Sequence, residues 1–197
     1  MINLESLVVG PFGTNCYILK SEKEGIIIDP GGNSSQIEEK TQGLKIKYIL
    51  LTHLHFDHLE ALGKIQTGTK AKIGLNEKDF TAQKDPFIDL DFLKKNPDLI
   101  LFLNENDSIF LSNTEVEILE TPGHTPGGLS FYIEKEGVII NGDTLFKNGV
   151  GRTDLPCSNQ KDLKMSLKKI LSLPDKTTVY PGHGKKTTIR NEKKNFI

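Results

Sequence analysis

Three of the five histidines in this chain fall within six residues, in the segment Thr52–His58, which reads T-H-L-H-F-D-H. An apolar run precedes the segment, so we expect the segment to follow directly from a β-strand. On an extended backbone, His53 and His55 point to the same side and can bind one cation together. Asp57 and His58 come one turn later, where a helix is expected to begin, and can reach a second cation. This spacing therefore predicts a site for two metal ions.

The remaining histidines also follow apolar runs, His124 within P-G-H-T-P-G and His183 within P-G-H-G. Asp143 ends another apolar run, where it is either a plain turn residue or a carboxylate that bridges two metals. Loops that leave the edge of a sheet are where binding residues concentrate. Imidazole and carboxylate donors together suit Zn²⁺, with Fe or Mn as alternatives. We therefore predict two divalent metal ions, zinc being the expected metal, held by His53, His55, Asp57, His58, His124, Asp143 and His183.

The rest of the chain alternates short apolar runs with turn residues and a few helical stretches, without a linker or repeat. A chain of 197 residues with this pattern predicts one domain, residues 1–197, of layered α/β type. Residues 77–98 are charged and contain two prolines, which fits either helix or a lid over the site. The expected strands are residues 7–10, 16–19, 25–29, 47–51, 99–103, 116–120, 129–134, 137–141 and 178–180, and the expected helices are 34–42, 58–66 and 159–171.

Composition narrows the possible partners. The 25 basic and 26 acidic residues give a net charge of −1, which argues against nucleic acid or an anionic membrane as a partner. No secretory signal and no apolar stretch of about 18 residues is visible, so we expect a cytoplasmic protein. Cys16 and Cys157 form neither a disulfide framework nor a redox motif, and Cys16, in an apolar run, is expected to be buried. Nothing in the sequence indicates an oligomeric state.

Seven segments spread almost end to end give the chain a resemblance to the metallo-β-lactamase superfamily, and within it to the short bacterial glyoxalase II-like hydrolases. The resemblance implies a four-layer αββα sandwich with the metals at one edge. It also implies that His53, His55 and His124 hold the first metal. The second metal then falls to Asp57, His58 and His183, with Asp143 as the bridge. The matching segments are Asn15–Tyr17, Ile26–Gly32, Thr52–His58, Pro122–Gly127, Gly142–Phe146, Gly151–Asp154 and Pro181–His183.

A two-metal site of this family predicts hydrolysis of a small-molecule thioester, such as S-lactoylglutathione, by a metal-bound hydroxide. Asp57 is the expected catalytic residue, which orients the hydroxide and relays its proton. Asp29 is the expected partner of a ligand imidazole, although it also fits a plain turn before Pro30.

The resemblance also suggests residues that contact the substrate. Arg152 stands where the glutathione-handling enzymes carry a lysine, and it can hold a carboxylate through two hydrogen bonds. Lys185 and Asp154 stand where those enzymes carry tyrosines. The resemblance therefore supports thioester hydrolysis more strongly than it supports glutathione as the thiol of the substrate. Phe146 is expected to line the substrate pocket, or else simply to pack. The predicted substrate-binding residues are therefore Arg152, Phe146 and Lys185.

A different reaction class is the strongest rival. Gly151–Asp154 also resembles the persulfide dioxygenases of this superfamily, which use one Fe(II) held by two histidines and an aspartate. His53, His124 and Asp143 would form that site, and such a set suits iron and O₂. The complete second set of donors favours the hydrolase. A nucleic-acid phosphodiesterase would need an RNA-gripping arm, and a β-lactamase would more often carry a cysteine at position 143.

Overall fold

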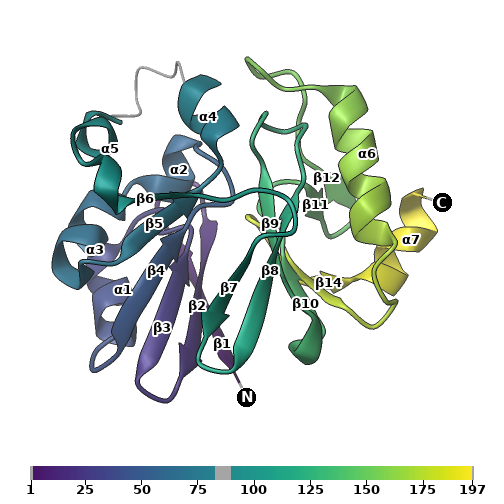
Figure 1. Ribbon diagram of the computed structural model, residues 1–197. Coiled ribbons are helices and arrows are strands. Elements are labelled where there is room, and N and C mark those ends of the chain that lie inside the picture. The colour runs from purple at the N-terminus through teal and green to yellow at the C-terminus, as the bar shows by residue number, and fades with distance from the viewer. Residues whose placement is uncertain (1, 83–89, 197) are drawn as a thin grey trace.

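The computed structural model describes residues 2–82 and 90–196. Two β-sheets pack face to face, with helices α1, α3 and α5 outside one sheet and α6 and α7 outside the other (Figure 1). The expected four-layer αββα sandwich is therefore confirmed. Among the described residues, none of the helices has the length and apolarity that crossing a membrane requires.

The first sheet has the strand order β1-β2-β3-β4-β5-β6, antiparallel from β1 to β3 and parallel from β3 to β6. Its central strands are apolar on both faces, as strands covered on both sides require. Ile27 faces the outer core with the helices, whereas Ile26 and Ile28 face the core between the sheets. Its elements are β1 Asn3–Val9, β2 Thr14–Ser21, β3 Glu24–Ile28, α1 Ser34–Lys40, β4 Lys45–Leu50, α2 Phe56–Leu59, α3 Leu62–Thr69, β5 Lys72–Leu75, α4 Glu77–Ala82, α5 Asp91–Lys95, a 3-10 helix Pro97–Leu99 and β6 Ile100–Phe102.

The second sheet has the order β14-β13-β10-β9-β8-β7. Helix α6 covers it, begins at the N-cap residue Asn159, whose side chain accepts two backbone hydrogen bonds, and buries Leu163 and Ile170. Its elements are β7 Ser108–Leu111, β8 Thr114–Glu120, β9 Leu129–Ile133, a 3-10 helix Glu134–Glu136, β10 Val138–Ile140, the hairpin β11 Leu145–Phe146 and β12 Gly149–Val150, α6 Gln160–Leu171, β13 Thr178–Tyr180, β14 Thr187–Thr188 and α7 Ile189–Phe196.

One predicted helix is wrong in its extent. Residues 58–66 do not form a single helix but lie in α2 and α3, which are separate. The amide of Ala61 donates a hydrogen bond to the carbonyl of Pro30, at 2.9 Å, instead of continuing the first helix. This long-range contact overrides the local helical pattern. In the predicted lid, residues 77–98, the structure has α4, α5 and the start of the next 3-10 helix, and residues 83–89 lie outside the described residues, so the lid stays a prediction.

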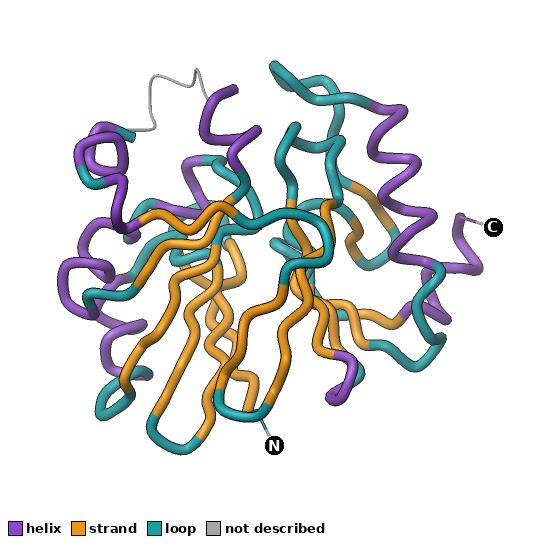
Figure 2. The backbone as a smooth tube through the Cα atoms, in the orientation of Figure 1, coloured by secondary structure: helices purple, strands orange, loops and turns teal. Residues whose placement is uncertain are grey.

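The loops that follow β3, β4, β8, β10 and β13 leave the sandwich at the same end, where residues from all five come together. Figure 2 shows loops gathered at the end of the strands that lies away from the N-terminus. The loops after β3 and β4 come from the first sheet, and the other three come from the second. A site at this edge therefore draws its side chains from both sheets.

Candidate metal centre

The seven predicted ligands come together at this edge. His53, His55 and His124 form a first donor group, in which the ligand atoms lie within 4.8 Å of one another. Within this group, Nε2 of His124 lies 3.0 Å from Nδ1 of His55. Since the loop after β4 carries His53 and His55 and the loop after β8 carries His124, this group spans both sheets.

Asp57, His58 and His183 form a second donor group with the same spread of ligand atoms. Nε2 of His183 lies 3.1 Å from Oδ2 of Asp57 and 3.4 Å from Nε2 of His58. Asp57 and His58 lie in α2, which follows β4 of the first sheet, and His183 follows β13 of the second sheet. This group therefore also joins the two sheets.

Asp143 lies between the two groups. Its Oδ1 is 3.6 Å from Nε2 of His58, and its Oδ2 is 3.6 Å from Nε2 of both His124 and His183. It also forms a group of potential ligands with His53 and His58. One carboxylate thus faces donors of both groups, which is the position that a bridging ligand needs.

The donors fit divalent cations, as two observations indicate. Nε2 of His53 and Oδ1 of Asp143 are buried without a hydrogen-bond partner among the described residues. Such groups are costly unless something pairs with them, and a cation would do so. Ligand atoms about 2.0–2.1 Å from a tetrahedral zinc lie roughly 3.3 Å apart, close to the separations of 3.0–3.7 Å seen here.

Asp29 holds two of the imidazoles in place. Its Oδ2 accepts hydrogen bonds from Nδ1 of His58, at 2.9 Å, and from the Thr52 hydroxyl, at 2.6 Å. Because that hydroxyl donates to Asp29, it can accept from Nδ1 of His53, 3.0 Å away. Nδ1 of His124 donates to the carbonyl of Arg152 at 2.8 Å. In the neutral form of each of these three rings, the proton therefore sits on Nδ1, and Nε2 is the nitrogen that faces the centre. The predicted contact between Asp29 and an imidazole is present.

The protonation of the imidazoles follows from their surroundings. Burial, followed by the nearby charges of His58 and the other histidines, lowers the pKa of His53 well below its usual value, so His53 is neutral. Burial also opposes a charged His58, but the charge and hydrogen bond of Asp29, with Asp143 and Asp57, outweigh it and raise the pKa of His58 to about 9. A buried cluster of this kind either holds protons or exchanges them for metal ions.

Residues at the start of β2 fix the second donor group. The Thr14 hydroxyl donates to Oδ2 of Asp57 at 2.8 Å, and Nδ2 of Asn15 donates to the carbonyls of Pro181 and Gly184, both at 2.9 Å. The loop that carries His183 is thereby tied to the first sheet. Asn15 belongs to one of the segments that match the family, but Thr14 was missed. No sequence pattern marks Thr14 as a site residue, apart from its place beside that segment.

The loop at His183 requires glycine. A Cβ atom on Gly182 would lie 2.1 Å from Oδ1 of Asp143 and 2.7 Å from Cε1 of His58. No side chain fits there, because the backbone passes directly over the donors. The glycine before the last histidine is therefore part of the site.

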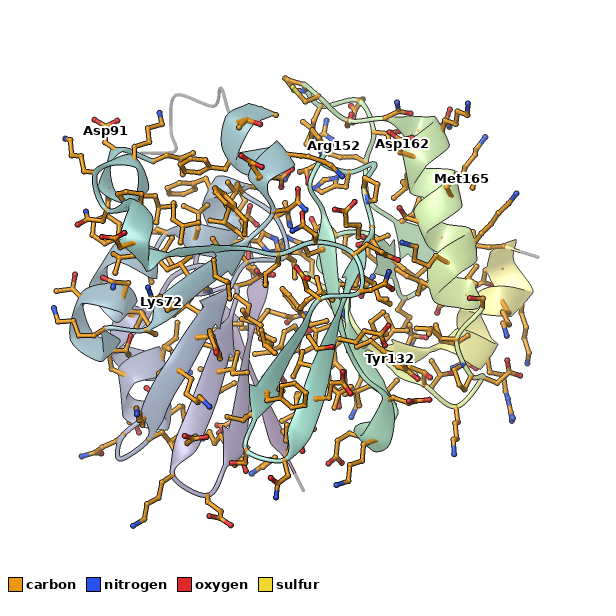
Figure 3. All side chains as sticks on the ribbon, in the orientation of Figure 1. Lys72, Asp91, Tyr132, Arg152, Asp162 and Met165 are labelled. Atoms are coloured by element: carbon orange, nitrogen blue, oxygen red, sulfur yellow. The ribbon has the colours of Figure 1, made fainter. Side chains whose placement is uncertain are left out.

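A cavity of about 620 Å³ opens beside the donors. Arg152 is among the residues that line it, and Figure 3 shows Arg152 among the loops at this end of the molecule. Both Nε and Nη2 of Arg152 donate to Asp154, at 2.7 and 2.8 Å. The lining residues do not include Phe146, whose ring centroid is 6.4 Å from that of His183, or the exposed Lys185. The full lining is Phe12, His55, Phe56, Asp57, His124, Asp143, Arg152, Leu155 and His183.

Three apolar residues of this lining were missed from the sequence. Phe12, Phe56 and Leu155 each come from a different loop or helix end, and Phe12 is 66% exposed. Exposed aromatic residues next to a cavity are a sign of ligand binding, but sequence alone does not reveal exposure. Apolar surface thus makes up much of the cavity wall away from the donors.

Comparison with known proteins decides the family. The family profile described as "Metallo-beta-lactamase superfamily" matches residues 9–183, which include all seven donors. The chain belongs to the metallo-beta-lactamase superfamily. Membership of this superfamily, together with the His/Asp cluster, supports a metal-dependent hydrolase.

Curated relatives of this metallo-beta-lactamase superfamily member cover nearly the whole chain. "Probable metallo-hydrolase YqgX" of Bacillus subtilis (strain 168) is 37% identical, over 93% of this chain and 91% of the relative. "Hydroxyacylglutathione hydrolase GloC" of Haemophilus influenzae (strain ATCC 51907 / DSM 11121 / KW20 / Rd) is 36% identical, over 98% of this chain and 96% of the relative. The similarity to these hydrolases therefore extends over nearly the full length of each relative.

Solved structures of the superfamily agree with the fold. The BLEG-1 B3 metallo-beta-lactamase has a TM-score of 0.86 at 35% identity, covering 98% of this chain and 97% of that chain. TTHA1623, in a di-iron-bound form, has a TM-score of 0.83 at 32% identity, covering 97% of this chain and 98% of that chain. These two structures carry different names, and what this chain shares with both is the fold.

Proposed function

We propose that this protein is a dinuclear metal-dependent hydrolase that cleaves the thioester bond of a small molecule such as S-lactoylglutathione. The observation that carries the proposal is the pair of donor groups that share Asp143, beside a cavity large enough for a small substrate. The likeness to the hydroxyacylglutathione hydrolase GloC supports the thioester as the bond that is cleaved.

In this proposal, the first donor group would hold one ion and the second donor group the other, with Asp143 available to both. Two such ions, when bound, lower the pKa of a shared water towards neutrality and polarise a carbonyl. Zinc is the expected metal because the donors are imidazoles and carboxylates in compact groups. A small-molecule substrate and a cytoplasmic location remain predictions.

Asp57 handles the proton. Burial opposes its ionised form, but the hydrogen bond with His183 and the charge of His58 outweigh burial and keep its pKa low, so its carboxylate stays ionised. Thr14 donates to the same oxygen and fixes the direction of the carboxylate. Asp57 therefore orients the attacking water and passes its proton on. A C–O bond forms, the C–S bond breaks, and the departing thiolate, a stronger base than the Asp57 carboxylate, takes the proton.

The cavity wall positions the rest of the substrate. Arg152 offers a cation to an anionic group of the thiol, although Asp154 already neutralises much of its charge. Phe12 and Leu155 offer apolar surface on the same wall. The acyl carbon thus lies at the donors while the thiol part lies against these residues.

A mononuclear Fe(II) persulfide dioxygenase is the second candidate. His53, His124 and Asp143 line one small pocket and form a two-histidine, one-carboxylate set, which suits iron and O₂. The di-iron-bound form of TTHA1623 adds that a relative of this fold carries iron. The second donor group, with all its members in contact, favours the hydrolase.

Elemental analysis, paired with thiol release from S-lactoylglutathione, tests the proposal. We expect about two metals per chain, and thiol release that His183→Ala abolishes and the surface variant Asp162→Asn leaves unchanged. About one iron per chain, no thioester cleavage, and oxygen uptake with glutathione persulfide would instead establish the dioxygenase.

A further inference from the structure

Asp79 is a buried carboxylate that is not part of either donor group. It lies in α4 and is 4% exposed. Its Oδ2 accepts hydrogen bonds from the amide of Leu54, at 3.2 Å, and from the hydroxyl of Thr125, at 2.9 Å. Its Oδ1 accepts from the amide of Gly127 at 2.5 Å. Both oxygens are therefore engaged by donors from two other segments.

These partners belong to the loops that carry the first donor group. Leu54 lies between His53 and His55, and Thr125 follows His124 directly. One carboxylate thus ties the loop after β4 in the first sheet to the loop after β8 in the second. Their separation sets the distance between the ring of His124 and the pair His53 and His55.

The position of Asp79 is itself fixed. The side chain of Asn76 accepts from the amide of Lys78 at the start of α4 and donates to the carbonyl of Leu103, at 2.9 Å in both cases. A Cβ on Gly127 would lie 2.6 Å from the amide of Asp79, so the second loop presses closely on the helix. Helix α4 therefore presents the carboxylate from an anchored backbone.

The contacts require a carboxylate rather than an amide. All three partners donate, and both oxygens of Asp79 accept. An asparagine would turn an NH₂ group towards at least one donor in a buried place, where water cannot take over the lost bond. Burial raises the pKa of Asp79, because a charged carboxylate is less stable away from water. The three hydrogen bonds act in the opposite direction and stabilise the charge.

The second donor group is held by other residues. Thr14 contacts Asp57, Asn15 contacts the loop that carries His183, and Asp29 contacts His58. None of the hydrogen bonds of Asp79 reaches Asp57, His58 or His183. Asp29 reaches both groups, His58 directly and His53 through Thr52, whereas the hydrogen bonds of Asp79 go to the two loops of the first group.

We propose that Asp79 is a positioning residue that sets the geometry, and hence the metal affinity, of the first donor group and not of the second. The inference rests on the metal binding in the proposed function, and it adds a residue that determines how firmly one of the two ions is held. Residues that orient metal ligands typically contribute a factor of about 10–100 in affinity.

The test is a titration of metal-free protein with Co²⁺ against a competing chelator, followed by the visible spectrum of the bound Co²⁺. We expect Asp79→Asn to weaken binding at one site by about 10–100-fold, with an altered spectrum, and to leave the other site at wild-type affinity. In a His183→Ala background, which lacks a donor of the second group, the weakened site should be the one that remains.

Glu192→Gln is the matched control. Glu192 is also fully buried and accepts from the hydroxyl of Thr187, the amide of Asn148 and the side chain of Asn195, none of which lies in a ligand loop. It should lower the melting temperature without changing either affinity or the spectrum. If Asp79→Asn does not fold, Thr125→Val, which removes one of the three hydrogen bonds, should weaken the same site to a smaller degree.

Two results would overturn the inference. One is an Asp79→Asn protein that binds both ions with wild-type affinity and spectrum while only its melting temperature falls. The other is equal weakening of both sites, which would show a general loosening. A wild-type protein that binds no Co²⁺ would instead refute the proposed function, and a wild-type protein that binds two ions but cleaves no thioester would leave this inference intact.

Discussion

Oδ2 of Asp29 lies 2.9 Å from Nδ1 of His58, and both side chains are fully buried. The contact fixes the tautomer of an imidazole whose other nitrogen faces Asp57, Asp143 and His183. A negative partner on the outer nitrogen also makes the inner one a stronger metal ligand. Asp29 therefore acts directly on the second donor group, and on His53 of the first only through the Thr52 hydroxyl, without itself being one of the seven donors.

Asp29→Asn should weaken metal binding at the second donor group by roughly 10–100-fold, since the amide presents a donor where an acceptor is needed. Competition with a chelator, monitored by metal content after dialysis, measures the loss. Asp162→Asn, a change on the exposed side of α6, is the control and should retain both ions. Full metal content in the Asp29 variant would show that the hydrogen bond serves the fold alone.

Metal removal should destabilise the protein, because His53 and Asp143 then keep buried atoms without a partner. With free ion at about 100 times its dissociation constant, bound metal adds about 2.7 kcal/mol, so chelation should lower Tm by roughly 5–10 °C. Thermal denaturation followed by circular dichroism measures the shift, and added Zn²⁺ should reverse it. Identical melting curves with and without chelator would refute this expectation.

Gly182→Ala should abolish tight metal binding and destabilise the fold by roughly 1–3 kcal/mol, because the new methyl group would overlap Asp143 and His58. Urea unfolding and metal analysis measure the two effects. Gly63→Ala is the control of opposite sign, since a Cβ there meets nothing within 4 Å in helix α3. That change should stabilise the protein by about 0.5–1 kcal/mol. Intact metal binding in the Gly182 variant would mean that the loop can move aside.

Asp154→Asn should raise kcat/KM for a thioester of glutathione, because it frees the Arg152 guanidinium for a substrate carboxylate. Both side chains are exposed, so the expected gain is modest, roughly two- to fivefold, and it should fade at high salt. The control substrate is the same acyl group on an uncharged thiol, whose kcat/KM should not change. A gain of equal size for both thiols would point to a change in the loop rather than in charge.

The local part of the site was predictable from the sequence. The spacing of His53, His55, Asp57 and His58 is a property of one segment, and the strand before it fixes where the side chains point. His124 and His183 could be placed because each follows an apolar run. Their pairing with particular partners came from the family resemblance and not from the spacing.

The supporting contacts were not predictable in the same way. Asp79 stands in a charged segment without a periodic pattern, and its role depends on two loops that are distant from it along the chain. Thr14 likewise matters only because β2 passes the end of α2. The single helix expected at 58–66 was wrong for the same reason, since Ala61 bonds to Pro30 across the fold. Tertiary hydrogen bonds leave no trace in local patterns.

Each of the two donor groups combines side chains that follow strands of both sheets, and Asp143, which follows β10 of the second sheet, lies between the groups. Ions bound there would act as cross-links across the seam of the sandwich, in the way that disulfides staple small secreted domains, but without need of an oxidising compartment. A chain that has lost its ions should therefore open first where the two sheets meet beside the donor groups. Hydrogen exchange would then rise first in the loops after β4 and β8, while the far end stays protected.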